Sequence, residues 1–251
     1  QMWGRLLYDP SLEDDYFIQF FQYRYGQKNG EILFEALTCA SEMPLSLASF
    51  YRGTWDFTLY CEGFLNGKQL YRNYQEASEA FIQIDEMIVH PTLDRRYLNI
   101  DQYVDRLLAG DEFKQDEITP QKLADQMARN HDEVLRLCQE IVKSPADSVS
   151  NFLIEINDVK AWAYLSLYFA EKIQAGIYLD LARKTQNPAY QERAIKWLHL
   201  AAENWRSLIE VTQQYQPVSL LHIRTYKFSW EYFYPKVLKD IEIAEAIFDG
   251  K

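Results

Sequence analysis

One stretch decides the fold: residues 151–184 read NFLIEINDVKAWAYLSLYFAEKIQAGIYLDLARK. Apolar residues recur along it in steps of three and four, and a second apolar set widens the apolar face. A helix that is apolar on most sides lies at the centre of a bundle. The pattern therefore predicts a long central helix over about 147–184. The first set is Phe152, Ile156, Val159, Ala163, Leu167 and Ala170, and the second is Ala161, Leu165 and Phe169.

Helical patterns also dominate the chain on both sides of this stretch. Ser11, with Asp14 three residues later, resembles a capping box, and Gly26 is a suitable end for the helix that follows. Thr119 and Pro120 form an N-cap followed by proline at the first helical position. The further helices are predicted over residues 11–26, 30–43, 73–88, 101–108, 119–143, from 188 onward, and 229–248.

The helices are expected to form an all-α, irregular helical bundle with a loop-rich aromatic N-terminal portion. No convincing strand pair and no fixed 34-residue repeat are found, so a regular helical solenoid is rejected. A charged loop near 110–118 marks a boundary between two portions. We expect a loop-rich helical portion over 1–112 and an antiparallel helical bundle over 113–251, with one single domain as the alternative.

Composition and charge exclude several kinds of partner. The 251 residues are 48% hydrophobic and 15% aromatic, which is enough for a sizeable core, and the net charge is −11. Nucleic acids need clustered Lys and Arg, and the sequence has no such cluster. No apolar run reaches the length of a transmembrane helix, so we expect no membrane insertion.

The sequence also contains no motif for a cofactor or a metal. The 3 cysteines are scattered, and none of the 4 histidines lies three or four residues from another. There is no glycine-rich phosphate loop and no nucleophile elbow. We therefore expect no cofactor and no metal site.

The first candidate site is the aromatic stretch FYRGTWDFTLYCEGFL, residues 50–65. Aromatic rings stack on the apolar faces of sugars, and charged side chains bind the hydroxyl groups, so this mixture suits a carbohydrate site. The alternative is ordinary core packing, with Arg52 paired to a nearby carboxylate. The candidate carbohydrate-binding residues are Arg52, Trp55, Asp56, Tyr60 and Glu62.

A second candidate is a polar stripe on the long central helix. Asn151, Glu155, Asp158 and Trp162 follow one another in steps of four, three and four, which places them on one face. Burying carboxylates is costly unless they are paired, so this stripe faces solvent, a buried partner or a cavity. Solvent exposure is the simplest interpretation. A cavity would add Glu155, Asp158 and Trp162 to the carbohydrate site, or make the two carboxylates an acid/base pair.

The first fifty residues resemble a known family. The segment WGRLLYDPSLEDDYFIQFFQYRYG, followed by a helix that ends ALTCASEMPLS, resembles the segment that leaves the catalytic barrel of α-glucuronidase-like enzymes and related multi-domain glycoside hydrolases. The resemblance covers roughly a fifth of the chain. The matching positions are Gly4, Arg5, Leu6, Asp9, Pro10, Tyr25, Gly26 and Ser41.

The resemblance implies a C-terminal accessory domain of a glycan-degrading protein. Such a domain packs on a (β/α)8 barrel, lines the carbohydrate cleft and mediates dimerisation, and the parent protein is secreted or periplasmic. The catalytic acids of those enzymes belong to the barrel, so none is assigned here. Two alternatives remain open. One is a free-standing helical protein-binding or scaffold module, and the other is an autonomous all-α glycan-active enzyme with Glu155 and Asp158 as its acids.

Overall fold

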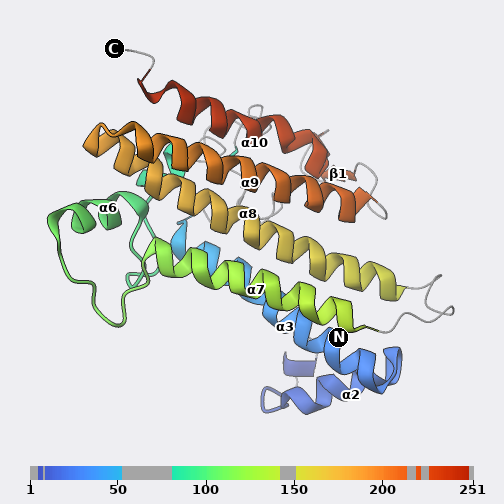
Figure 1. The fold of residues 1–251 in the computed structure, drawn as a ribbon. Helices are drawn as coiled ribbons and strands as arrows, with labels where there is room; N and C mark the ends of the chain where they lie inside the picture. The colour runs from blue at the N-terminus through green and yellow to red at the C-terminus, as the bar shows by residue number, and fades with distance from the viewer. Residues whose placement is uncertain are drawn as a thin grey trace.

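The computed structural model describes residues 5–7, 9–52, 81–141, 151–213, 219–221 and 226–248. Its elements confirm the predicted all-α fold class (Figure 1). The helices are α2 (Asp14–Tyr25), α3 (Gln27–Phe50), α5 (Ile84–Val89), α6 (Ile100–Ala109), α7 (Pro120–Glu140), α8 (Asn151–Thr185), α9 (Pro188–Gln213) and α10 (Trp230–Glu245). A short 3-10 helix, η4 (Ala246–Phe248), follows α10.

The long helix α8 is the centre of the bundle, as the apolar pattern predicts. It packs against α9 on one side and α7 on the other, and it also contacts α3, α5 and α6 (Figure 1). Every residue from 168 to 177 is buried, which is almost three full turns of helix. An α-helix is buried on all sides only when neighbours surround it, so this stretch anchors the core.

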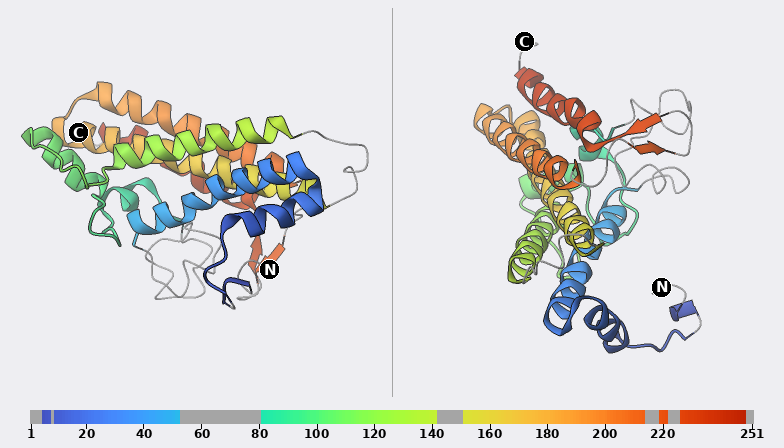
Figure 2. Two further views of the ribbon diagram at one scale, coloured as in Figure 1. Left: turned by 90° about the horizontal axis from the view of Figure 1, so that it is seen from below. Right: turned by 90° about the vertical axis from the view of Figure 1, so that its right-hand side faces the viewer.

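The α2–α3 pair lies at the edge of the bundle, furthest from α10 (Figures 1 and 2). Gly26 joins the two helices with a φ of 84°, a left-handed value that favours glycine. At Gly30 a Cβ atom would lie 2.4 Å from backbone atoms of Phe21 and Gln22. Only glycine allows α3 to approach α2 this closely.

Several helix ends carry the capping residues that local chemistry favours, including the predicted start at Thr119 and Pro120. Gly110 ends α6 in the left-handed conformation, with a φ of 75°. The Thr119 hydroxyl accepts a hydrogen bond from the Lys122 backbone N–H at 3.1 Å, with Pro120 as the first helical residue. The Asn187 side chain accepts from the Ala189 backbone N–H at 3.0 Å, next to the start of α9.

Other local predictions were wrong. Ser11 does not cap α2, because the Asp9 carboxylate accepts hydrogen bonds from both the Ser11 backbone N–H and its hydroxyl, at 3.0 and 2.6 Å. This local turn competes with the helix, which begins only at Asp14. Of the helix expected over 73–88, the described part is helical only from Ile84 onward.

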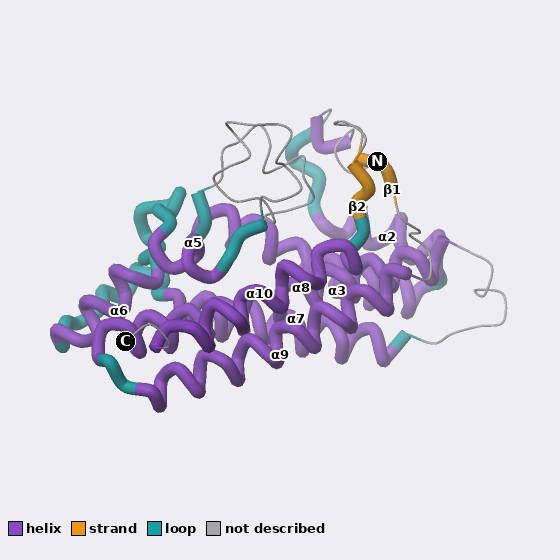
Figure 3. Tube along the Cα trace, turned by 90° about the horizontal axis from the view of Figure 1, so that it is seen from above, coloured by secondary structure: helices purple, strands orange, loops and turns teal. Residues whose placement is uncertain are grey.

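The connection before α10 contains a short strand pair that the sequence analysis did not predict. Strand β1 (Ser219–Leu221) pairs antiparallel with β2 (Tyr226–Phe228), with Ser219 opposite Phe228. Figure 3 shows this pair at the edge of the helical bundle. Three-residue strands of this kind lack the alternating run by which strands are recognised in a sequence.

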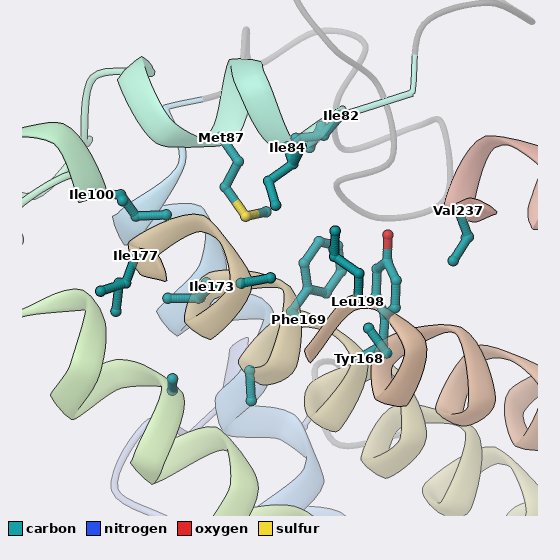
Figure 4. Packing of buried hydrophobic residues seen from close by; sticks show 14 of the residues in the cluster. Ile82, Ile84, Met87, Ile100, Tyr168, Phe169, Ile173, Ile177, Leu198 and Val237 are labelled. Atoms are coloured by element: carbon teal, nitrogen blue, oxygen red, sulfur yellow. The ribbon is translucent and has the colours of Figure 1, made fainter. Parts of the chain in front are cut away.

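The larger hydrophobic core draws on residues from both predicted portions of the chain. Leu47 and Ile84 from the first portion share it with Leu123, Phe169 and Trp205 from the second. Figure 4 shows Ile84 and Met87 of α5 pointing toward the α8 side chains that they pack against. The division at 112/113 stays a prediction, and this core packs part of each portion against the other.

Candidate functional site

Four of the residues in the aromatic stretch, Trp55, Asp56, Tyr60 and Glu62, lie outside the described residues, so their role stays a prediction. Arg52 is described, and it is exposed. Its backbone N–H donates to the Pro91 carbonyl at 3.0 Å, and its carbonyl oxygen lies 2.6 Å from Nε2 of His90. The backbone at Arg52 is therefore held in place from both sides.

Tyr51, the residue before Arg52, belongs to a buried aromatic pair. The Tyr51 ring stacks on the His90 imidazole with centroids 3.9 Å apart, and the Tyr51 hydroxyl donates to Glu86 Oε1 at 2.7 Å. Burial, together with the neighbouring carboxylate, raises the pKa of Tyr51 well above its usual value. The hydroxyl therefore stays protonated and keeps donating to Glu86, which ties the end of α3 to α5.

A fully buried ion pair fastens the chain where the described residues resume after 53–80. Lys172 Nζ of α8 lies 2.6 Å from Asp240 Oδ2 of α10, and both side chains are 1% exposed. The ammonium also donates to the Ile82 carbonyl and, at 3.2 Å, to the Tyr168 hydroxyl. Burial lowers the pKa of Lys172 and raises the pKa of Asp240, while each charge offsets part of the other's desolvation.

The ion pair holds the segment that enters α5. Asp240 Oδ1 accepts a hydrogen bond from the Ile84 backbone N–H at 2.8 Å. The Phe81 ring lies 4.7 Å from Lys172 Nζ and stacks on Phe233 at 5.9 Å. We call this set the buried anchor: Phe81, Ile82, Ile84, Tyr168, Lys172 and Asp240. Together, the buried anchor and the Tyr51–His90 pair fix the two described ends that flank residues 53–80.

The polar stripe on α8 is only partly exposed. Glu155 is half-buried, and its Oε1 accepts a hydrogen bond from the Tyr25 hydroxyl at 3.0 Å. Burial and this carboxylate raise the pKa of Tyr25 to about 12. Asp158 is half-buried, and Trp162 is 38% exposed. The structure therefore gives Glu155 a partner on α2 and places Trp162 at the surface.

Sequence reasoning missed the charged residues in the buried part of α8. Glu171 accepts a hydrogen bond from Asn204 of α9 at 2.8 Å, and burial raises its pKa to about 7 despite that bond. The nearby Glu203 raises it further. A Glu-Lys pair at 171–172, inside an otherwise apolar helix, is a sequence signal for buried charge. Its partners lie on other helices and could not be found from spacing.

The hydrogen bonds and the buried ion pair described above position the backbone more than they offer groups for chemistry. The buried carboxylates and the buried ammonium already bind partners within the fold, so they hold backbone in place. In the described ranges, no group of three or more His, Cys, Asp or Glu side chains could hold a metal ion. Over the same part of the chain, none of the helices combines the length and the apolar character needed to cross a bilayer.

Comparisons with known proteins give one informative result. No family model matches the chain, and no curated protein matches it. Among solved structures, the fold is similar to one described as a GH138 enzyme targeting pectin rhamnogalacturonan II, with a TM-score of 0.63 and 10% sequence identity. The match covers 97% of this chain and 36% of that chain, so the chain spans about a third of its neighbour's length. The likeness establishes a shared fold with one part of a glycoside hydrolase.

Proposed function

We propose that this chain is a helical accessory domain at the C-terminal end of a glycan-degrading, glycoside hydrolase-like protein. The domain packs on a catalytic barrel and lines the carbohydrate cleft. One observation carries the proposal: nearly the whole chain, 97% of it, is similar in fold to 36% of a glycoside hydrolase. The resemblance of the first fifty residues to the barrel-exit segment of α-glucuronidase-like enzymes points in the same direction.

The candidate carbohydrate contacts belong to two regions. The first is the aromatic stretch with Arg52, Trp55, Asp56, Tyr60 and Glu62. It lies within the segment whose described flanks are held by the Tyr51–His90 pair and by the buried anchor. Rigid ends suit a binding segment, because less conformational freedom is lost when a ligand binds. The second region is the polar stripe on α8. There Trp162 presents an exposed ring beside Glu155 and Asp158.

Calorimetric titration of the full-length gene product tests this function. The probes are oligosaccharides from rhamnogalacturonan II, the substrate class of the structural neighbour. Trp55→Ala is expected to weaken binding about tenfold, the loss of one aromatic stacking contact, while the melting temperature changes little. Trp162→Ala is expected to do the same at the second region.

The control is Tyr232→Ala, because Tyr232 is also an exposed aromatic residue but lies on α10. It is expected to leave glycan affinity unchanged. A Trp55→Ala protein that binds as tightly as the wild type, with only a lower melting temperature, would assign Trp55 to packing. Tight binding by both tryptophan variants would remove the carbohydrate role from this domain.

A further inference from the structure

Three acidic side chains of the described residues are buried, and they differ in what balances their charge. Asp240 is paired with Lys172 at 2.6 Å, and Asp180 is paired with Lys184 at 2.9 Å. Glu171 of α8 is 6% exposed, yet no described Lys, Arg or His side chain forms an ion pair with it. Burying a carboxylate without a counter-charge is costly, so the ionised form of Glu171 is out of place in this fold.

The groups that surround Glu171 do not balance its charge. On α9, Nδ2 of Asn204 donates a hydrogen bond to Glu171 Oε2 at 2.8 Å, and the neighbouring Glu203 is an exposed carboxylate that repels it. On α8, the adjacent Lys172 is already paired with Asp240 of α10. Burial raises the pKa of Glu171 to about 7 and Glu203 adds to the increase, although the Asn204 hydrogen bond lowers it. A single neutral donor therefore does not compensate for burial.

Asn204 adjoins the aromatic centre of the bundle. The next residue, Trp205, is fully buried, and its ring lies 4.7 Å from the Tyr168 ring of α8. Trp205 Nε1 donates to the Trp230 carbonyl at 2.9 Å, at the start of α10. Helix α9 lies between α8 and α10 (Figure 1), so a shift of α9 at Asn204 reaches both neighbours.

We propose that Glu171 makes the contact between α8 and α9 sensitive to pH. While its carboxyl group is neutral, it stays between the two helices and accepts the hydrogen bond from Asn204. When the carboxyl group loses its proton to solvent, the carboxylate takes up water, and the segment of α9 around Asn204 and Trp205 loosens. This inference is independent of the proposed function, since it concerns contacts within this chain alone.

Amide hydrogen exchange in α9, measured at several pH values, tests the proposal. Glu171→Gln keeps an acceptor for Asn204 but cannot ionise, so it provides the reference rate at each pH. The wild-type rate divided by this reference is expected to rise at least about tenfold between about pH 5.5 and about pH 8 for the amides of residues 200–208. The indole N–H of Trp205 is expected to follow the same curve.

A second variant tests the electrostatic cause. Glu203→Gln removes the carboxylate that repels Glu171, so the midpoint of the curve is expected to move to lower pH. Glu203 is exposed, so its replacement does not disturb the packing of α9. A purely structural role of this part of α9 would not move the midpoint.

The matched control is Glu192→Gln, because Glu192 is also an exposed carboxylate on α9 but lies about three turns from Glu203. It is expected to leave the midpoint unchanged. A ratio of exchange rates that stays flat across this pH range would overturn the proposal. So would a midpoint that Glu203→Gln and Glu192→Gln leave equally unchanged.

Discussion

The two halves of α8 use charged residues in opposite ways. In the half from 168 to 177, Lys172 is fully buried and paired with Asp240 at 2.6 Å. In the half from 151 to 162, Glu155 and Asp158 are half-buried beside the exposed Trp162. Both halves show the same apolar periodicity in the sequence. Burial on all sides converts a charged residue into an anchor, whereas the charged residues of the other half remain partly exposed to solvent.

The difference also predicts unequal contributions of charged residues to stability along one helix. Lys172 holds the backbone that enters α5, and its removal would leave Asp240 buried without its ion-pair partner. The stripe in the other half can change with little cost, because solvent compensates for lost contacts. Substitutions that probe the two halves should therefore produce unequal effects.

The largest expected effect comes from breaking the buried ion pair. Lys172→Met is expected to lower the free energy of unfolding by about 3–5 kcal/mol, because Asp240 would stay buried without its counter-charge. Urea unfolding followed by circular dichroism measures the loss. The double variant Lys172→Met with Asp240→Leu is expected to recover most of it.

The matched control lies in the other half of α8. Glu155→Gln keeps an acceptor for the Tyr25 hydroxyl and is expected to cost less than about 0.5 kcal/mol. If the single Lys172 variant and the double variant lose equal stability, the ion pair does not explain the loss. If Glu155→Gln costs as much as Lys172→Met, the contrast between the two halves is wrong.

A smaller effect is expected at two closely packed glycines, Gly30 on α3 and Gly176 on α8. Gly30→Ala would place a Cβ atom 2.4 Å from the backbone of α2, which cannot give way without moving the helix. We expect a loss of about 2 kcal/mol in thermal or urea unfolding.

At Gly176, on α8, a Cβ atom would meet only the Cδ1 atom of Ile100 at close range, at 2.7 Å. Ile100 can rotate that atom away, and alanine favours the helix, so Gly176→Ala is expected to change stability by less than about 0.5 kcal/mol. A Gly30→Ala protein as stable as the wild type would show that the α2–α3 pair tolerates a wider spacing.

The pH dependence of the free energy of unfolding gives a further test of the buried half of α8. The pKa of Glu171 in the folded chain is about 7, above the ordinary value for a glutamate of 4.5, so the folded state holds a proton that the unfolded state has released. The free energy of unfolding is therefore expected to fall by about 1–3 kcal/mol as the pH rises from 4.5 through 7. Glu171→Gln is expected to remove this slope, as measured by urea unfolding at several pH values.

The control for this slope is Glu155→Gln, which is expected to leave it unchanged. A wild-type protein whose stability does not fall between pH 5 and 8, or a Glu171→Gln protein that keeps the slope, would contradict the assignment. In either case Glu171 would be ionised in the folded state at neutral pH.

A modest effect is expected where α2 meets the first half of α8. Tyr25→Phe removes the hydroxyl that donates to Glu155 but keeps the ring stacked on Phe152. We expect a loss of about 1 kcal/mol in urea unfolding, the value of a partly buried hydrogen bond. An unchanged stability would mean that solvent replaces this bond completely and that Glu155 is free for a ligand.

Local signals predicted much of the fold and little of the candidate site. The periodicity of residues 151–184, the Thr119–Pro120 start and the Gly26 end of α2 follow from short-range chemistry, and the structure agrees with them. The capping of α2 by Ser11 failed because Asp9, only two residues away, offers a competing acceptor. The contacts of Lys172 with Asp240 and of Tyr25 with Glu155 join residues 68 and 130 positions apart, and spacing carries no information about such pairs.

The most direct test of the account is the primary structure of the intact gene product, determined by sequencing the gene and measuring the mass of the natural polypeptide. The account predicts a chain roughly two to three times as long as these 251 residues, with a glycoside hydrolase part before residue 1. A natural polypeptide that begins at residue 1 and degrades glycans by itself would contradict it.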